Sequence, residues 1–332
     1  MPEDPTTVPA RHAAAGSPLA ALFPGQGSQV LGMGHALFEA SPAARAVLDE
    51  AEATLPGLLS LMWEGPAETL QLTANQQPAL LTVSTAAVAA WREANGASIT
   101  HAAGHSLGEY SALVTAGSLT LADALRLVRA RGEAMQRAVP EGRGAMAAVL
   151  KTDAEHVARV LASIDGVVEI ANRNSPQQTV ISGAAEAVAA AVERLRAEGA
   201  RAVPLKVSAP FHCSLMASAA AELAPLLATT AFAPPMLSVI ANVSADVIRT
   251  GDEARALLER QVTGPVRWLE TLERLYTAGV RRFVEFGSGT VLTALVERTL
   301  EDVTALAVND PASLRSAHAA LTHASVPGED QR

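Results

Sequence analysis

A serine framed by two glycines, in Gly104-His105-Ser106-Leu107-Gly108, restricts the folds open to this chain more than any other feature. The segment at residues 99–103 predicts a strand before this turn, and a helical pattern follows it through Val114. A strand, a sharp turn and a helix around G-x-S-x-G expose a serine hydroxyl at the end of a parallel sheet. The sequence therefore predicts an α/β protein with Ser106 as a nucleophile, and a purely structural turn is the alternative.

Strand and helix patterns alternate along most of the chain. Ser41-Pro42 predicts a capped helix start, and Asn95-Gly96 predicts a helix stop. Outside residues 144–208 we expect strands at 19–23, 99–103, 236–241 and 282–286, and helices from residue 42, at 78–94, 121–138, 214–227, 252–261 and 266–278, with a last helix after Gly287-Ser288-Gly289. This order predicts an α/β-hydrolase-like core with a parallel sheet.

Residues 144–208 have a pattern of their own. Their order is β-α-β-β-α-β, with strands expected at 145–150, 167–172, 179–182 and 202–207, helices at 153–163 and 185–198, and a turn at Asn174-Ser175-Pro176. This is the ferredoxin-like order, so we expect an inserted small subdomain at 144–208. The large subdomain would then comprise residues 18–143 and 209–324, between a flexible leader at 1–17 and a loose tail at 325–332.

Charge and cysteine content exclude several classes of protein. The 332 residues carry a net charge of −9, whereas nucleic-acid binding requires a dense basic surface. Cys213 is the only cysteine, which excludes an intramolecular disulfide and a cysteine metal cage and favours a cytoplasmic location. Charged residues interrupt the alanine-rich segments, so we expect no membrane span.

A serine nucleophile needs a base to take its proton, and the chain offers eight histidines. Four are set aside because they lie in the leader, in a subdomain helix or near the C-terminus: His12, His156, His318 and His323. Of the remaining His35, His101, His105 and His212, we favour His212 as the base. It follows Pro210-Phe211 where the small subdomain returns to the large one, although a structural histidine is the alternative. His105 is expected to line the site.

Two backbone N–H groups are needed to stabilise an oxyanion, and two segments could supply them. Leu107, directly after the nucleophile, would give one, and Gln26 in Gly25-Gln26-Gly27 would give the other. The alternatives for the second segment are a simple glycine-rich turn or a weak phosphate loop. It lacks the G-x-x-x-x-G-K pattern, so nucleotide binding is not expected there.

Arg131 lies between Ala130 and Gly132 in a helix pattern where burial is expected. An isolated buried guanidinium is costly, so Arg131 should face an anion. That anion would be a glutamate in a structural ion pair or the carboxylate of a substrate, which arginine can bind with two hydrogen bonds.

Six motifs in one order resemble the malonyl-CoA:acyl-carrier-protein transacylase family, over about residues 19–308. They are Phe23-Pro24-Gly25-Gln26-Gly27-Ser28-Gln29, Gly104-His105-Ser106-Leu107-Gly108-Glu109-Tyr110, Arg131-Gly132, Ala171-Asn172-Arg173-Asn174-Ser175-Pro176, Pro210-Phe211-His212 and Glu285-Phe286-Gly287-Ser288-Gly289. The resemblance implies a free-standing acyltransferase of fatty-acid or polyketide biosynthesis that acts on malonyl-CoA and an acyl carrier protein.

The resemblance also implies a role for each matching residue. Ser106 would be acylated with His212 as base, and Gln26 and Leu107 would bind the oxyanion. Arg131 would hold the malonyl carboxylate, and the main-chain carbonyl of Gln261 would orient His212. The acyl pocket would include His105, Met135, Phe211 and Asn174, and neither a metal nor an organic cofactor is expected.

Phe211 bears on the choice of acyl group. Polyketide acyltransferases that select malonyl commonly have phenylalanine before the histidine, and a ring beside the acyl pocket should reject an α-methyl branch by ~1–3 kcal/mol. The alternatives are an editing hydrolase of acyl carrier proteins, a transferase for a different acyl group and a non-catalytic docking module. An acidic carrier would need a local basic group such as Lys206, Arg201, Arg173 or Arg267.

Overall fold

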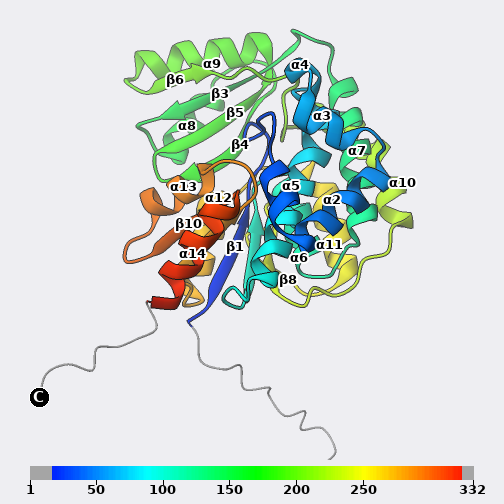
Figure 1. Ribbon diagram of the computed structural model, residues 1–332. Coiled ribbons are helices and arrows are strands. Elements are labelled where there is room, and N and C mark those ends of the chain that lie inside the picture. The colour runs from blue at the N-terminus through cyan, green and yellow to red at the C-terminus, as the bar shows by residue number, and fades with distance from the viewer. Residues whose placement is uncertain (1–16, 324–332) are drawn as a thin grey trace, which may run out of the picture.

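The computed structural model describes residues 17–323, which form two β-sheets surrounded by helices (Figure 1). His12, the leader apart from Ser17, and the tail lie outside the described residues. No helix within 17–323 is long and apolar enough to span a membrane.

The larger sheet has six strands in the order β10-β9-β1-β2-β7-β8. Its strands are β1 (Leu19–Phe23), β2 (His101–Gly104), β7 (Ser238–Ile240), β8 (Val247–Ile248), β9 (Arg282–Phe286) and β10 (Thr304–Val308). All neighbours are parallel except β7 and β8. The chain leaves β1 for β2 on one side and later places β9 on the other, so the carboxyl ends of these strands meet at one edge.

The helices pack on both faces of this sheet and on the smaller one. They are α1 (His35–Ala40), α2 (Pro42–Thr54), α3 (Leu58–Glu64), α4 (Ala67–Leu70), α5 (Thr73–Glu93), α6 (Gly108–Thr115), α7 (Leu121–Ala138), α8 (Ala154–Leu161), α9 (Ala185–Ala197), the short 3₁₀ helix η1 (Ser214–Met216), α10 (Ala217–Thr229), α11 (Gly251–Gln261), α12 (Trp268–Thr277), α13 (Val291–Thr299) and α14 (Pro311–His323). Ser41 caps α2 by accepting a hydrogen bond from Ala44 N, which confirms the predicted start.

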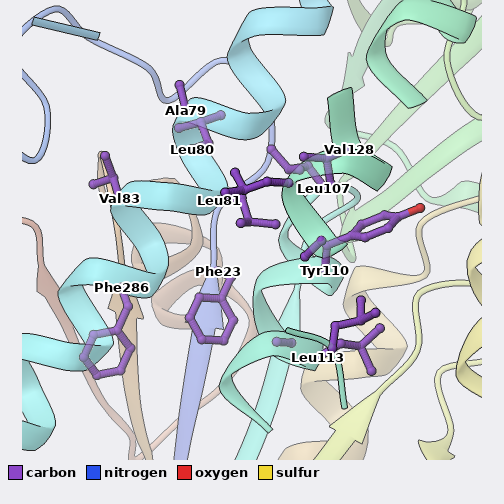
Figure 2. Packing of buried hydrophobic residues seen from close by; sticks show 14 of the residues in the cluster. Phe23, Ala79, Leu80, Leu81, Val83, Leu107, Tyr110, Leu113, Val128 and Phe286 are labelled. Atoms are coloured by element: carbon purple, nitrogen blue, oxygen red, sulfur yellow. The ribbon is translucent and has the colours of Figure 1, made fainter. Parts of the chain in front are cut away.

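Alternate residues of β1 build the two hydrophobic layers. Leu19, Ala21 and Phe23 pack in one core cluster with α5, α6 and α7, and Figure 2 shows the Phe23 ring among side chains of α5 and α6. Ala20 and Leu22 point to the other face, where they pack with α12 and α13. Successive strand side chains face opposite ways, so a fully apolar strand such as β1 belongs in the middle of three layers.

The smaller sheet is antiparallel, with strands in the order β4-β5-β3-β6. Its strands are β3 (Gly144–Leu150), β4 (Val168–Ser175), β5 (Gln178–Ala184) and β6 (Arg201–Pro204). Helices α8 and α9 pack on it through a separate core cluster. This is the ferredoxin-like arrangement that the sequence predicts, while the exact division of the chain at residues 144 and 208 stays a prediction.

A parallel bridge joins the two parts of the molecule. Arg173 N of β4 donates to Val266 O at 2.9 Å, and Val266 N donates to Ala171 O at 2.8 Å. Val266 lies between α11 and α12, so the small sheet holds the segment that follows α11.

Several expected elements differ from the structure. The sheet is not wholly parallel, and α13 is not the last helix, because β10 and α14 follow it. Both β8 and β10 are edge strands, and β10 is only partly buried. Helix α5 begins at Thr73 rather than Pro78, with the proline inside the helix.

Two further differences affect the site. Asn174 was expected in a turn, but it lies in β4 where the pairing with β5 shifts register. A β-bulge of this kind accommodates one extra residue and re-aims its side chain. Strand β6 ends at Pro204 instead of residue 207, which leaves residues 205–208 as an exposed loop.

Candidate active site

Ser106 lies at the sharp turn between β2 and α6, with φ at 51°. A positive φ costs about 1–3 kcal/mol for a residue with a side chain, so the surrounding structure must hold it. Gly108 permits the crowding: a Cβ there would lie 2.1 Å from Phe23 O of β1. Because α6 can approach β1 this closely, the serine hydroxyl lies at the carboxyl edge of the sheet.

His212 reaches Ser106 from the loop between β6 and η1. Its Nε2 lies 2.7 Å from Ser106 Oγ, and its Nδ1 lies 2.9 Å from Gln261 O and 3.1 Å from Gly264 O. Carbonyl oxygens only accept hydrogen bonds, so Nδ1 carries the ring proton. Nε2 is then free to accept the proton of the serine hydroxyl.

The surroundings of His212 keep its ring neutral. Burial lowers its pKa to about 3, and the positive charge of Arg131 acts in the same direction, against the hydrogen bonds to Gln261 and Gly264. The neutral ring is the form that can accept a proton, so His212 is in the protonation state that a general base requires at neutral pH.

Arg131 lies on α7, 1% exposed, with its guanidinium directed at the serine. Its Nη2 donates to Ser106 Oγ at 3.1 Å and to Gln261 Oε1 at 3.0 Å, and its Nη1 donates to Gln77 Oε1 at 2.8 Å. Within residues 17–323 it forms no ion pair, so the alternative of a structural pair with a glutamate is not what the structure shows. A buried cation lies beside the nucleophile without a carboxylate bonded to it.

The loop after β1 lies against the serine turn. A Cβ on Gly25 would be 2.7 Å from His105 O, so only glycine allows this approach. The Gln26 side chain is held by α5, since its Nε2 donates to Gln76 Oε1 at 2.8 Å and its Oε1 accepts from Gln77 Nε2 at 3.2 Å. The backbone N–H groups of Gln26 and Leu107 have no acceptor among the described residues.

A cavity of about 640 Å³ opens beside this cluster. The residues lining it are Gln26, Gly27, Gln29, Glu68, Gln71, Leu72, Thr73, Gln76, His105, Ser106, Met146, Asn172, Leu205, Lys206, Val207, Ser208, Phe211 and His212. Ser106, His212 and Phe211 therefore share one space, and Phe211 is 9% exposed. The other two remaining histidines lie elsewhere: His35 packs on Trp63, and His101 is hydrogen-bonded to Thr100.

The cavity differs from the expected acyl pocket at two positions. Met135 is 1% exposed and packs against Gln77, and Asn174 turns its Oδ1 to His105 Nε2 at 2.8 Å, so neither lines the cavity. His105 does line it, and burial lowers the pKa of that ring. Leu107, Arg131 and Gln261 lie behind the lining residues.

The four basic residues that we considered for carrier docking have different surroundings. Arg173 is ion-paired with Glu270 at 2.8 Å, and Arg267 lies 3.3 Å from the same carboxylate. Lys206 lines the cavity and has no ion-pair partner among the described residues, and Arg201 is exposed. Lys206 is thus the one lysine or arginine among the lining residues.

Sequence reasoning missed two amide side chains that hold the site. Gln77 joins Gln26 to Arg131, and Asn242 Oδ1 accepts the Ser106 N–H at 2.7 Å. Asn242 follows β7, beside β2, so its position at the carboxyl edge of the sheet was the available signal. Gln77 was missed because the helix was expected to start one residue after it.

No cluster of histidine, cysteine, aspartate and glutamate within residues 17–323 is arranged to hold a metal ion.

Comparisons with known proteins agree with this geometry. The acyl transferase domain family matches residues 21–322. The malonyl CoA-acyl carrier protein transacylase of Bacillus subtilis (strain 168) is 46% identical over 306 residues, which cover 91% of this chain and 96% of that protein. The crystal structure of acyl-carrier-protein-S-malonyltransferase from Bartonella henselae has a TM-score of 0.89 and 44% identity, covering 92% of this chain and 99% of that one.

A second solved structure contains two proteins, a type II PKS acyl-carrier protein in complex with its malonyl-transacylase. Its matching chain has a TM-score of 0.89 and 44% identity, covering 92% of this chain and 100% of that one. These matches confirm the family that the six sequence motifs predicted. The chain belongs to the acyl transferase domain family and, within it, to the malonyl-CoA:acyl-carrier-protein transacylases.

Proposed function

We propose that the protein transfers a malonyl group from malonyl-CoA to the phosphopantetheine thiol of an acyl carrier protein through an ester on Ser106. Ser106 Oγ attacks the thioester carbonyl while its proton passes to His212 Nε2. The C–S bond then breaks, and His212 returns the proton to the leaving CoA sulfur. The carrier thiol attacks the Ser106 ester in the same way, with His212 again moving the proton.

The hydrogen bonds around Ser106 and His212 are placed to stabilise the charges that develop in these steps. When His212 becomes positive, the carbonyl oxygens of Gln261 and Gly264 stabilise it through Nδ1–H. The negative oxygen of the tetrahedral intermediate would accept hydrogen bonds from the N–H groups of Gln26 and Leu107. Every proton and charge in the scheme is thereby assigned to residues of this chain.

The observation that carries the choice of acyl group is the buried Arg131 beside Ser106 Oγ. The carboxyl carbon of a malonyl ester is three bonds from Oγ, so its carboxylate falls within the neighbourhood of Nη2, 3.1 Å from that oxygen. A buried cation whose hydrogen bonds among the described residues go only to neutral side chains favours a substrate that brings a carboxylate to it. A hydrolase of uncharged acyl chains would gain nothing from this cation, so the transferase is favoured over the editing hydrolase.

The shape of the entrance supports a thiol on a long arm as the acceptor. The cavity connects Ser106 to the exposed loop at residues 205–208, and a relative of this chain is solved in complex with an acyl carrier protein. We propose the same class of partner here, in the cytoplasm, where malonyl-CoA and carrier proteins serve fatty-acid or polyketide synthesis. The single cysteine is free and buried, as suits a reducing compartment.

Acyl-CoA loading tests the proposal. The protein is incubated separately with malonyl-, methylmalonyl- and acetyl-CoA, and the adduct is measured by intact mass and located by peptide mapping. We expect a malonyl adduct on Ser106 that disappears when a carrier protein with its phosphopantetheine arm is added. An adduct on another residue, or a malonyl ester that only water removes, would contradict the transferase.

A further inference from the structure

Glu109 is a buried carboxylate to which the proposed reaction assigns no step. It lies in the first turn of α6, three residues after the nucleophile, and its side chain is 0% exposed. Ionised carboxylates are rarely buried without a partner, so its contacts should show what it does there.

One oxygen of Glu109 accepts hydrogen bonds from a main-chain N–H and from a side-chain amide. Its Oε2 accepts from Asn242 N at 3.0 Å and from Gln261 Nε2 at 2.8 Å. Its Oε1 has no hydrogen-bond partner among the described residues. The carboxylate therefore joins the end of β7 to the end of α11 beneath the serine turn.

The side-chain amides of Asn242 and Gln261 in turn hold the main chain of the nucleophile. Asn242 Oδ1 accepts the Ser106 N–H at 2.7 Å, and Gln261 Nε2 donates to Ser106 O at 2.9 Å. Asn242 Nδ2 also donates to Gly104 O at 2.7 Å, on the strand side of the turn. Since Ser106 has a positive φ, these bonds oppose its relaxation to a more favourable backbone conformation.

Gln261 extends this control to the rest of the site. Its Oε1 accepts from Arg131 Nη2 at 3.0 Å, and its main-chain oxygen lies 2.9 Å from His212 Nδ1. A displacement of Gln261 would therefore move the serine backbone, the arginine and the base together.

We propose that Glu109 is a positioning residue, whose Oε2 fixes Asn242 and Gln261 and through them the strained backbone of Ser106 and the guanidinium of Arg131. The inference rests on the proposed function only where it names malonyl as the acyl group that is transferred. This role requires a hydrogen-bond acceptor at the position of Glu109 Oε2, because both partners are N–H donors. It does not require the negative charge of the carboxylate.

Two substitutions with side chains of nearly equal length distinguish the effect of the acceptor oxygen from the effect of the rest of the side chain. Glu109→Gln keeps one oxygen that can accept from both amides, whereas Glu109→Met has none. The rate constant for phosphonylation of Ser106 by an alkyl fluorophosphonate, measured per folded molecule, reports the serine and histidine without involving a malonyl group. Steady-state malonyl transfer gives kcat and KM.

We expect Glu109→Gln to lie within about threefold of the wild type in both assays, and Glu109→Met to lose about 10²-fold in the phosphonylation rate and in kcat with a smaller change in KM. Glu285 supplies a matched control, because it is also a fully buried carboxylate but is bound to Thr293 N and Oγ1 on the far side of β1. We expect folded Glu285→Met to keep wild-type rates.

Glu109→Asp guards against a Met variant that does not fold, since it withdraws the oxygen by one methylene and should slow phosphonylation about tenfold. The proposal is overturned if folded Met or Asp variants react like the wild type, if Gln is as slow as Met, or if Glu285→Met loses as much. Failure of the malonyl assignment would look different, because the wild type would then give no malonyl ester while the order of the phosphonylation rates persisted.

Discussion

His212 Nε2 lies 2.7 Å from Ser106 Oγ, and both residues have positive φ, 59° and 51°. Neither is a glycine, so each backbone is held in a conformation that costs about 1–3 kcal/mol. Gln261 contacts both residues, through its side chain at Ser106 O and through its main-chain oxygen at His212 Nδ1. The serine hydroxyl and the histidine ring are thus brought together by two strained turns, and Gln261 restrains both of them.

The pH dependence of stability should reveal the titration of two buried groups, His212 and Glu109. Burial lowers the pKa of His212 to about 3, so the unfolded chain binds more protons below pH 6.5 and stability falls on acidification. Burial raises the pKa of Glu109 to about 7, against the opposing effects of Asn242, Gln261 and Arg131. The folded chain therefore binds the extra proton between pH 4.5 and 7, and this contribution to stability is lost as the pH rises.

The two effects oppose each other between pH 4.5 and 6.5, and Glu109→Gln removes one of them. The wild type should lose stability relative to this variant by about 1.4 kcal/mol per pH unit as the pH rises from 4.5 towards 7. Urea unfolding at a series of pH values measures the difference. A difference that stays constant across this range would mean that Glu109 titrates normally.

Arg131→Ala should change which acyl groups the enzyme accepts. The malonyl carboxylate would lose charge-assisted hydrogen bonds worth about 1.5–3 kcal/mol, so kcat/KM for malonyl-CoA should fall at least 10–10²-fold. Acetyl-CoA has no carboxylate and should be used as well as before or better. Arg131→Lys should rescue only part of the loss, because lysine cannot replace the paired donors to Gln77 and Gln261. Unchanged preference for malonyl over acetyl would exclude the carboxylate role.

The sequence predicted the architecture because its signals are local. An apolar run followed by Pro24 and Gly25 marks β1, the glycines around Ser106 mark the turn after β2, and the order of strands and helices in 144–208 is enough for a ferredoxin-like unit. Ser106 and His212 could be found because a turn pattern and a proline-flanked loop each mark one residue.

The amide network could not be predicted in the same way. The contacts of Glu109 with Asn242 and with Gln261 each join residues more than one hundred positions apart in the sequence. Only the fold brings these partners together. Asn174 shows the same limit, since its turn-like neighbours indicate a loop while the structure places it in a bulge facing His105. Composition and periodicity carry no information about such contacts.

Lys206→Ala should weaken the binding of substrates that carry a phosphate. Lys206 is the lining residue with a free positive charge, on the exposed loop at the cavity entrance, and the pantetheine arm is attached through a phosphate in both CoA and the carrier. An exposed contact is worth at most about 1 kcal/mol, so KM for malonyl-CoA should rise by about three- to fivefold. Malonyl-pantetheine, which lacks the phosphate, should be unaffected. Lys151, the other lysine, does not line the cavity, and Lys151→Ala is the control.

Phe211→Ser should widen the range of acyl groups. The ring lines the cavity beside His212 and is 9% exposed, so its removal leaves space next to the acyl ester. One methyl group in such a pocket is worth about 1–3 kcal/mol, so kcat/KM for methylmalonyl-CoA relative to malonyl-CoA should increase by about 10–10²-fold. Competition between the two acyl-CoAs, read as the ratio of the two Ser106 adducts, measures this directly. Phe38→Ser, which removes a ring packed on Trp63, should leave the ratio unchanged. If both variants shift the ratio equally, or if neither does, Phe211 is a packing residue and the selection against an α-methyl branch lies elsewhere in the cavity.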